Sequence, residues 1–141
     1  MQTPDIQLSD HFRLLEFTRS KTAIDHQIDN TPNLQQIYNL QQLCFEVLEP
    51  LRRRFGAIHI TSGFRCKKVN QLVGGAEGSQ HLLGEAADIF IPNTEILTKY
   101  RYFLKENCDF DQMILEPLNT PEKRWLHVSF SHRHKNRNQI L

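Results

Sequence analysis

Two short runs of sequence, GEAADIFI over residues 84–91 and RWLHVSF over residues 124–130, most constrain the fold of this chain. Both runs are short, bounded and rich in apolar residues, a pattern that indicates β-strands. Side chains alternate between the two faces of a strand, so Asp88 and His127 each leave their strand on the face opposite to their apolar neighbours. If the two strands are adjacent in a sheet, Asp88 and His127 meet on one face.

A second histidine stands close to this pair in the sequence. His81 lies in the stretch SQHLLGEAAD, three residues before Gly84, where the backbone can turn and bring the imidazole toward the same face. Gly84 and Ala86 are small, so they leave room for an ion and a substrate beside the sheet. Two imidazoles and one carboxylate form a zinc ligand set that leaves one coordination position open for water. His81, Asp88 and His127 are therefore candidate metal ligands.

The same residue types also have an ordinary structural explanation. A histidine within a strand often makes a hydrogen bond in the core or faces solvent, and an aspartate near a strand end often caps a turn. Five further histidines lack comparable spacing and are expected to be ordinary polar residues: His11, His26, His59, His132 and His134. Spacing alone therefore leaves both the zinc site and this simpler explanation open.

The composition indicates a single globular domain, residues 1–141, with a net charge of +1. This near-neutral charge gives no reason to expect a nucleic-acid partner, and the basic C-terminal stretch HRHKNRNQIL is expected to be solvated. Three cysteines without CxxC spacing argue against a disulfide framework and a cysteine-rich zinc site. The N-terminus shows no signal-peptide pattern, and no apolar run reaches the roughly 20 residues of a membrane span. Nothing in the sequence indicates an oligomeric state.

The remaining elements are predicted to place helices against the sheet. Residues 1–30 are expected to form a loop with one helical turn, followed by a helix with Thr31 as its N-cap, Pro32 as its first residue and a kink at Pro50. The other predicted elements are a strand at 57–61, a helix at 66–73, a helix capped by Thr94, and a strand at 110–116 that forms a hairpin with 124–130. This order predicts an α+β fold with a small, mostly antiparallel sheet and helices packed against it.

Two motifs connect the chain to a known family. SQHLLGEAAD matches the pattern S-x-H-x-x-G-x-A-x-D at every fixed position, and WLHVS matches the second half of the same signature. With these motifs the chain resembles the zinc D-alanyl-D-alanine carboxypeptidase family, which shares its fold and metal site with the hedgehog signalling domain. The segments SGFRCKKVNQLVGG, HFRLLEFTRS and FDQMILE are similar to a subgroup that includes small phage-type peptidoglycan peptidases. The resemblance implies a hedgehog/DD-peptidase-like fold and a zinc ion bound by His81, Asp88 and His127.

The resemblance also implies roles for residues around the metal. Arg65, in SGFR, matches the family arginine that binds substrate near the scissile carbonyl, where a guanidinium stabilises developing charge. A surface ion pair is the structural alternative for Arg65. Ser79 and Gln80 border the ligand motif and are candidates for contact with substrate. Ser79 is expected to bond the backbone or a ligand rather than to attack, because an activated water makes a serine nucleophile unnecessary.

The sequence departs from the family pattern at the catalytic base. Many members carry a glutamate three residues before the second histidine, whereas this chain has Arg124, which cannot accept a proton. Glu116 ends the strand before the hairpin connection and is the first candidate for the base, because the resemblance implies that it faces the metal across the hairpin, as the equivalent glutamate of hedgehog-like domains does. Glu122, in the connection itself, is the second candidate. The structural alternative for either residue is a solvated loop carboxylate.

Together these features predict a zinc metallopeptidase that cuts peptide bonds in peptidoglycan stem peptides. The bond is either the terminal D-Ala–D-Ala bond or an internal bond of the L-Ala–D-Glu type. A catalytically inactive, zinc-containing binding module of hedgehog-like fold is the alternative, and it should lack a carboxylate near the zinc. A small α+β domain without metal is a third hypothesis. Without a visible signal peptide, the chain is expected to be made in the cytoplasm and to act on the cell wall after phage-type release, like an endolysin.

Overall fold

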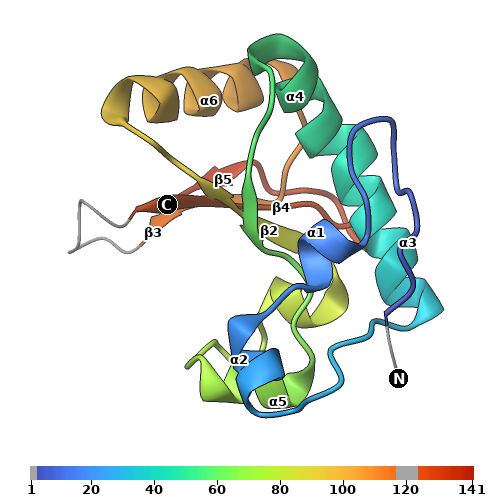
Figure 1. Ribbon diagram of the computed structural model, residues 1–141. Coiled ribbons are helices and arrows are strands. Elements are labelled where there is room, and N and C mark those ends of the chain that lie inside the picture. The colour runs from blue at the N-terminus through green and yellow to red at the C-terminus, as the bar shows by residue number, and fades with distance from the viewer. Residues whose placement is uncertain (1–2, 117–123) are drawn as a thin grey trace.

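A computed structural model describes residues 3–116 and 124–141 of the chain (Figure 1). The described strands form one sheet in the order β1-β2-β4-β3-β5. The strands are β1 (Ile60–Ser62), β2 (Ala86–Phe90), β3 (Gln112–Glu116), β4 (Trp125–Ser129) and β5 (Gln139–Ile140). Adjacent strands are antiparallel except β3 and β5, which run parallel. The fold is therefore α+β, as predicted, with a mixed sheet that is mostly antiparallel.

Helices lie on both sides of this sheet. In the view of Figure 1, α4 and α6 lie above the sheet, and α2 and α5 lie below it. The helical elements in chain order are α1 (Leu15–Thr18), α2 (Lys21–Asp25), α3 (Leu34–Leu43), η1 (Cys44–Leu48), α4 (Glu49–Phe55), α5 (Lys67–Leu72), η2 (Gln80–Leu83) and α6 (Thr94–Asn107). Within the described parts of the chain, no helix has the length and apolar character needed to cross a membrane.

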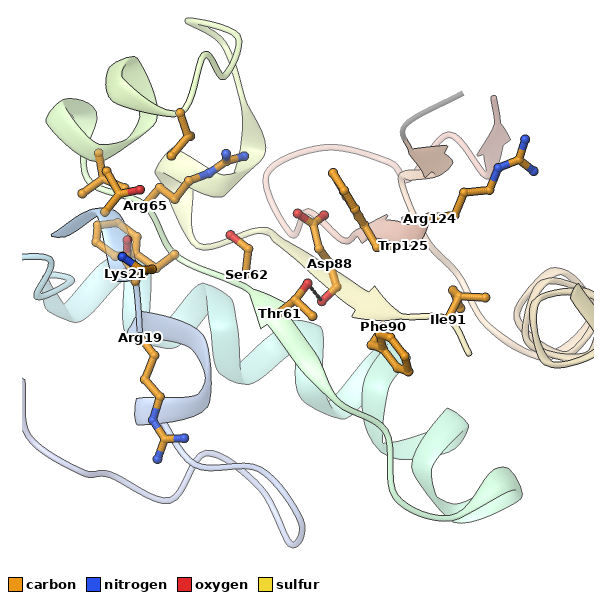
Figure 2. A pocket seen from close by; sticks show the side chains of 15 residues that line it. Arg19, Lys21, Thr61, Ser62, Arg65, Asp88, Phe90, Ile91, Arg124 and Trp125 are labelled. Carbon is orange, nitrogen blue, oxygen red and sulfur yellow. Dashed lines mark hydrogen bonds between the residues drawn. The ribbon is translucent and has the colours of Figure 1, made fainter. Parts of the chain in front are cut away.

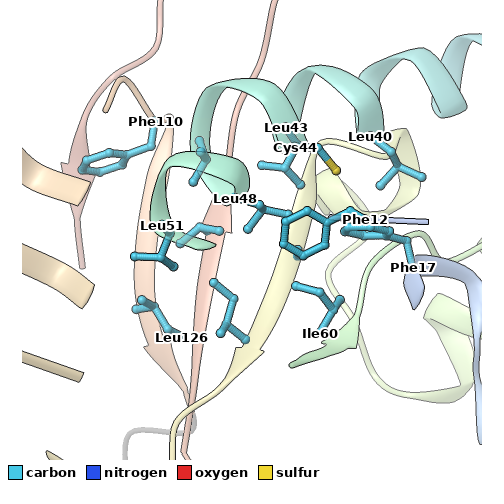
Figure 3. Packing of buried hydrophobic residues seen from close by; sticks show 14 of the residues in the cluster. Phe12, Phe17, Leu40, Leu43, Cys44, Leu48, Leu51, Ile60, Phe110 and Leu126 are labelled. Atoms are coloured by element: carbon cyan, nitrogen blue, oxygen red, sulfur yellow. The ribbon is translucent and has the colours of Figure 1, made fainter. Parts of the chain in front are cut away.

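One face of the sheet carries the hydrophobic core. Ala87 and Ile89 of β2 and Leu126 and Val128 of β4 are fully buried in this core. Helices α3 and α4 and the π-helical turn η1 supply the facing side chains, including Leu40, Leu43, Leu48 and Leu51 (Figure 3). The predicted alternation of both strands is thus confirmed, because these four apolar residues share the core face and Asp88 and His127 lie on the other.

The register of β2 and β4 brings the two polar strand residues together. The strands are antiparallel neighbours, and Asp88 pairs directly with His127. Directly opposed residues project to the same face of a sheet. We call this face the polar face, and its residues on the two strands are Ala86, Asp88, Phe90, Trp125, His127 and Ser129.

Two predicted helix starts are wrong by one or two residues. Asn33, rather than Thr31, caps α3: its side-chain oxygen accepts from the Gln36 N–H at 2.8 Å, and the Gln36 side-chain oxygen accepts from the Asn33 N–H at 2.8 Å. This reciprocal capping box satisfies two backbone donors at once, and it therefore sets the helix start. Asn93, rather than Thr94, caps α6 through its side-chain oxygen.

Pro50 is accommodated by a local change of helix type. The residues just before it form the π-helical turn η1, in which the Glu49 N–H donates to the Cys44 carbonyl oxygen five residues back. A proline has no N–H to donate and its ring crowds the preceding turn, so a widened turn absorbs the mismatch. Pro50 then lies in the first turn of α4, where the missing N–H is tolerated.

Two other predicted boundaries shift. The strand predicted at 57–61 is observed as Ile60–Ser62, and its pairing with β2 changes register between these two residues. Two short helices, α1 and α2, replace the single helical turn predicted for residues 1–30. Phe17 of α1 is fully buried, so this N-terminal region contributes to the core as well as covering it.

The C-terminal segment (residues 132–141) is largely exposed, as predicted, but it is also docked onto the protein, which the sequence did not indicate. Its residues 139–140 form the edge strand β5 on β3, and its two arginines pair with buried carboxylates. Arg133 binds Glu85, which lies 48 residues earlier, and Arg137 binds Asp111, which lies 26 residues earlier. Such distant pairs leave no periodic signal in the sequence, so a short basic stretch looks the same whether it is solvated or docked.

Candidate metal centre

The three predicted ligands, His81, Asp88 and His127, converge at the polar face and are all buried. One ligand atom from each lies within 4.8 Å of the others. The Oδ1 atom of Asp88 is 3.2 Å from His81 Nε2 and 3.1 Å from His127 Nδ1. Two ligands that bind zinc tetrahedrally at about 2.0 Å stand about 3.3 Å apart, so these spacings fit a zinc ion.

The turn that carries His81 directs its imidazole toward the sheet. Ser79 Oγ accepts a hydrogen bond from the His81 N–H at 3.1 Å at the start of η2, and Gly84 ends the turn with φ of +74°. This left-handed conformation favours glycine. A Cβ atom at Gly84 would also lie 2.5 Å from the Gln36 carbonyl oxygen. The expectation that Gly84 lets the chain turn beside His81 is confirmed by its φ, whereas the space left by its missing side chain lies against the Gln36 carbonyl oxygen of α3.

The hydrogen bonding of His81 favours a cation between it and Asp88. His81 Nδ1 is 2.6 Å from the Gly63 carbonyl oxygen, which can only accept, so Nδ1 carries the proton. When the ring is neutral, Nε2 presents a lone pair toward the Asp88 carboxylate oxygen 3.2 Å away, and a metal ion between these two atoms would bind both. When the ring is protonated, Nε2 instead donates a hydrogen bond to Asp88. A carbonyl partner on the far ring nitrogen is also typical of histidines that bind metals.

Asp88 is held in its ionised form. Burial raises the pKa of this carboxyl group, but hydrogen bonds with His127 and His81 and the charges of both rings outweigh burial and lower the pKa below its ordinary value. A carboxylate must be ionised to bind a metal. Two imidazole nitrogens and one carboxylate oxygen therefore form a donor set that fits zinc and leaves a coordination position for a reactant.

A cavity of about 640 Å³ opens beside Asp88 (Figure 2). Its lining combines apolar side chains such as Phe64 and Phe90 with the half-buried Arg65, whose guanidinium extends toward Asp88 in Figure 2. The buried Nε of Arg65 has no hydrogen-bond partner in the described part of the chain. Burial lowers the pKa of Arg65, and the charges of Asp88 and Glu116 act in the opposite direction. Arg65 thus places a positive charge at the wall of the cavity, beside Asp88.

Glu116, the first candidate for the base, lies on the polar face. It pairs with Trp125, which precedes His127 by two residues on β4, so Glu116 and His127 project to the same side. Its charge also acts on Arg65, so the two side chains are within electrostatic reach of each other. The role of Glu116 as a base stays a prediction. Glu122, the second candidate, lies outside the described residues.

Ser79 and Gln80 make hydrogen bonds within the protein. Ser79 caps the turn that begins before His81, and Gln80 Nε2 donates to Glu85 at 3.2 Å and to Asp111 at 3.0 Å. The lining of the cavity described above includes neither residue. Their contact with substrate stays a prediction, and the structure gives both a part in holding the metal-binding turn.

Trp125 is a residue of the site that the sequence reasoning did not single out. It lines the cavity, and its buried indole Nε1 has no hydrogen-bond partner among the described residues. The strand alternation that located His127 also places Trp125 on the polar face, so the signal was present in the sequence.

Comparison with known proteins decides the class of this site. A family model described as peptidase M15 matches residues 10–129. The chain belongs to this family. M15 peptidases are zinc-dependent and similar to D-Ala-D-Ala carboxypeptidases, so the resemblance drawn from the motifs is confirmed. A comparison with curated proteins found no match.

Membership of the family implies that the buried cluster of two histidines and one aspartate is a zinc site. This M15 peptidase is a zinc metallopeptidase, and its cluster of His81, Asp88 and His127 lies inside the matched region and fits the ion. Arg65 and Glu116 lie inside the match as well. The match ends at residue 129, so the C-terminal segment that docks onto the sheet lies beyond it.

Proposed function

We propose that this M15 peptidase cuts peptide bonds in peptidoglycan stem peptides, either the terminal D-Ala–D-Ala bond or an internal bond of the L-Ala–D-Glu type. The observation that supports this substrate is the cavity beside the candidate zinc ligands, which is lined by the guanidinium-bearing Arg65. Stem peptides carry free carboxylates, and a guanidinium binds a carboxylate with charge-assisted hydrogen bonds. The substrate places the action at the cell wall, which the protein would reach after phage-type release.

In the proposed reaction, the metal ligands, Arg65 and Glu116 have separate roles. A zinc ion held by His81, Asp88 and His127 would supply Lewis acidity to the scissile carbonyl and to a water molecule. Arg65 binds an oxygen of the peptide and orients the scissile bond. Glu116 accepts a proton from the attacking water and later donates a proton to the leaving amine.

Digestion of purified peptidoglycan tests the proposal directly. The zinc-loaded protein is incubated with sacculi, and the released products are identified by mass spectrometry. Free D-alanine indicates the carboxypeptidase reaction, and fragments with a new D-Glu N-terminus indicate the endopeptidase reaction. The double variant His81→Ala/His127→Ala is the control without metal. Binding of sacculi without release of any product would instead identify a binding module.

The base is tested by Glu116→Gln at matched zinc content. Glutamine keeps the shape and the hydrogen-bonding reach of Glu116 but cannot accept a proton from the attacking water. General-base catalysis commonly contributes about 10²–10⁴-fold, so kcat should fall by that factor while zinc stays bound. Steady-state kinetics on a stem peptide measure the loss.

Glu122→Gln is the matched comparison for this variant, because it removes the other candidate carboxylate by the same chemical change. It should retain near wild-type turnover. Full activity in Glu116→Gln together with a large loss in Glu122→Gln would transfer the role to Glu122. Full activity in both variants would remove both residues from the mechanism.

A further inference from the structure

The C-terminal segment is fastened to the body of the protein by two bidentate ion pairs. Arg133 donates to both carboxylate oxygens of Glu85, at 2.7 and 2.9 Å, and Arg137 donates to both oxygens of Asp111, at 2.9 and 2.7 Å. Both carboxylates belong to fully buried residues. Paired hydrogen bonds of this kind fix orientation as well as position, so the two carboxylates are held rigidly.

Gln80 joins these two ion pairs to the metal centre. Its Nε2 donates to Asp111 Oδ2 at 3.0 Å and to Glu85 Oε1 at 3.2 Å. Ionised carboxylates only accept hydrogen bonds, so the amide nitrogen of Gln80 must be the end that faces them. Gln80 directly precedes His81 in η2, and its carbonyl oxygen accepts from the Glu85 N–H at 3.0 Å. The residue that binds the carboxylates of both ion pairs, Gln80, is therefore the one directly before the zinc ligand His81 in the sequence.

We propose that the C-terminal segment positions the zinc ligand His81, and that it acts through Gln80. Arg133 and Arg137 hold the two carboxylates, the carboxylates hold the Gln80 amide, and Gln80 holds the turn that presents His81 Nε2 to the metal. The family match ends before this segment, so the proposal concerns a part of the chain to which the match assigns nothing. It goes beyond the proposed function, because it concerns zinc binding rather than the bond that is cut.

Zinc affinity and a cobalt spectrum test the proposal without any measurement of activity. The variants are Arg137→Gln, Gln80→Leu and the double variant, and zinc Kd is measured by competition with a chromophoric chelator. Loss of a partner that orients a metal ligand commonly lowers metal affinity by about 10–100-fold, so each single variant should raise the zinc Kd by at least about tenfold. The visible absorption of the cobalt(II)-substituted protein should change in both, because the position of His81 changes.

The double variant distinguishes positioning through Gln80 from general support of the fold. If Arg137 acts through Gln80, its replacement should add little once Gln80 has become leucine, so the double variant should bind zinc about as weakly as Gln80→Leu. Arg13→Gln is the control, because Arg13 makes an exposed pair with Asp5 at 2.9 Å that involves no zinc ligand. It should leave both Kd and the cobalt spectrum unchanged.

Three results would overturn the proposal. Wild-type zinc affinity and an unchanged cobalt spectrum in Gln80→Leu would show that Gln80 does not position His81. Fully multiplicative losses in the double variant would show that Arg137 acts by another route. A wild-type protein that binds no zinc would remove the premise. Gln80→Leu leaves both ion pairs in place, so it decides the question even if Arg137→Gln does not fold.

Discussion

Arg65 combines two properties that suit a substrate-binding residue. It is partly buried beside the candidate zinc ligands, which costs solvation of its charge, and its Nε donor has no partner among the described residues. Asp88 and Glu116 offset part of that cost through their charges. A carboxylate or carbonyl oxygen of a bound peptide would give the Arg65 guanidinium a hydrogen-bond partner. Substrate binding would thereby gain a charge-assisted hydrogen bond.

Arg65→Ala should therefore keep zinc and the fold but weaken turnover. A hydrogen bond from a charged group is worth roughly 1.5–3 kcal/mol, so kcat/KM on stem peptides should fall by about tenfold to a hundredfold. Arg53→Ala is the control, since Arg53 is an exposed arginine on α4, away from the cavity. Unchanged kinetics in Arg65→Ala, at equal zinc content, would contradict a role in substrate binding.

At the scale of elements, helix α3 supports the metal-binding turn. The Gln36 side-chain amide donates to the Leu82 carbonyl oxygen at 3.1 Å, and the Asn39 amide donates to the Leu83 carbonyl oxygen at 2.8 Å. These bonds satisfy the carbonyl groups at the end of η2. The close approach of α3 that they require leaves no space for a side chain at Gly84.

Gly84→Ala should consequently destabilise the protein. The left-handed conformation alone costs a non-glycine residue roughly 1–2 kcal/mol, and the contact with the Gln36 carbonyl oxygen adds to it, so unfolding in urea should show a loss above about 1 kcal/mol. Gly78→Ala is the matched control, because a Cβ atom at Gly78 meets no atom within 4 Å. Equal stability of the two variants would show that the turn relaxes without cost.

At the scale of the whole molecule, the core and the metal site occupy opposite faces of the sheet. The buried cluster of α3, η1, α4 and the inner faces of β2 and β4 does not include any zinc ligand. Its apolar burial stabilises the fold whether or not an ion is bound. Zinc should therefore add to stability without being required for folding.

Removal of the metal by a chelator should leave the far-ultraviolet circular dichroism intact and lower Tm. Zinc at a hundredfold excess over Kd stabilises by about 2.7 kcal/mol, which corresponds to a shift of roughly 5–10 °C for a domain of this size. The His81→Ala/His127→Ala protein should show no such shift. Loss of secondary structure on chelation would instead show that folding depends on the ion.

The docked C-terminal segment should make stability depend on acidic pH. Hydrogen bonding from Arg137 is the largest cause that lowers the pKa of Asp111, to about 2, whereas an unfolded aspartate titrates near pH 4. Because the pKa is lower in the folded protein, this stabilisation is complete above about pH 4 and is lost as the pH falls toward 2. The difference in unfolding free energy between wild type and Arg137→Gln should shrink over that range.

Urea unfolding of the metal-free proteins between pH 2 and pH 6 measures this difference, and the absence of zinc excludes acid release of the ion as its cause. A difference that stays constant with pH would mean that the ion pair with Asp111 does not contribute to the acid dependence of stability.

The sequence by itself determined the features that depend on local periodicity. Alternation along two strands placed Asp88 and His127 on the faces opposite to the core side chains, so the two residues could meet if the strands were neighbours. The structure then showed that the strands are adjacent and that Asp88 pairs directly with His127. The pattern of ligands and glycine around His81 identified the family. These signals survive in sequence because each arises within a few neighbouring residues.

Only the tertiary structure decided the features that depend on distant partners. The docking of the C-terminal segment depends on Glu85 and Asp111, which are buried only after the sheet has formed. A polar residue changes from a solvated group to a buried partner when a remote strand covers it, and that change is a property of the assembled fold rather than of the local sequence.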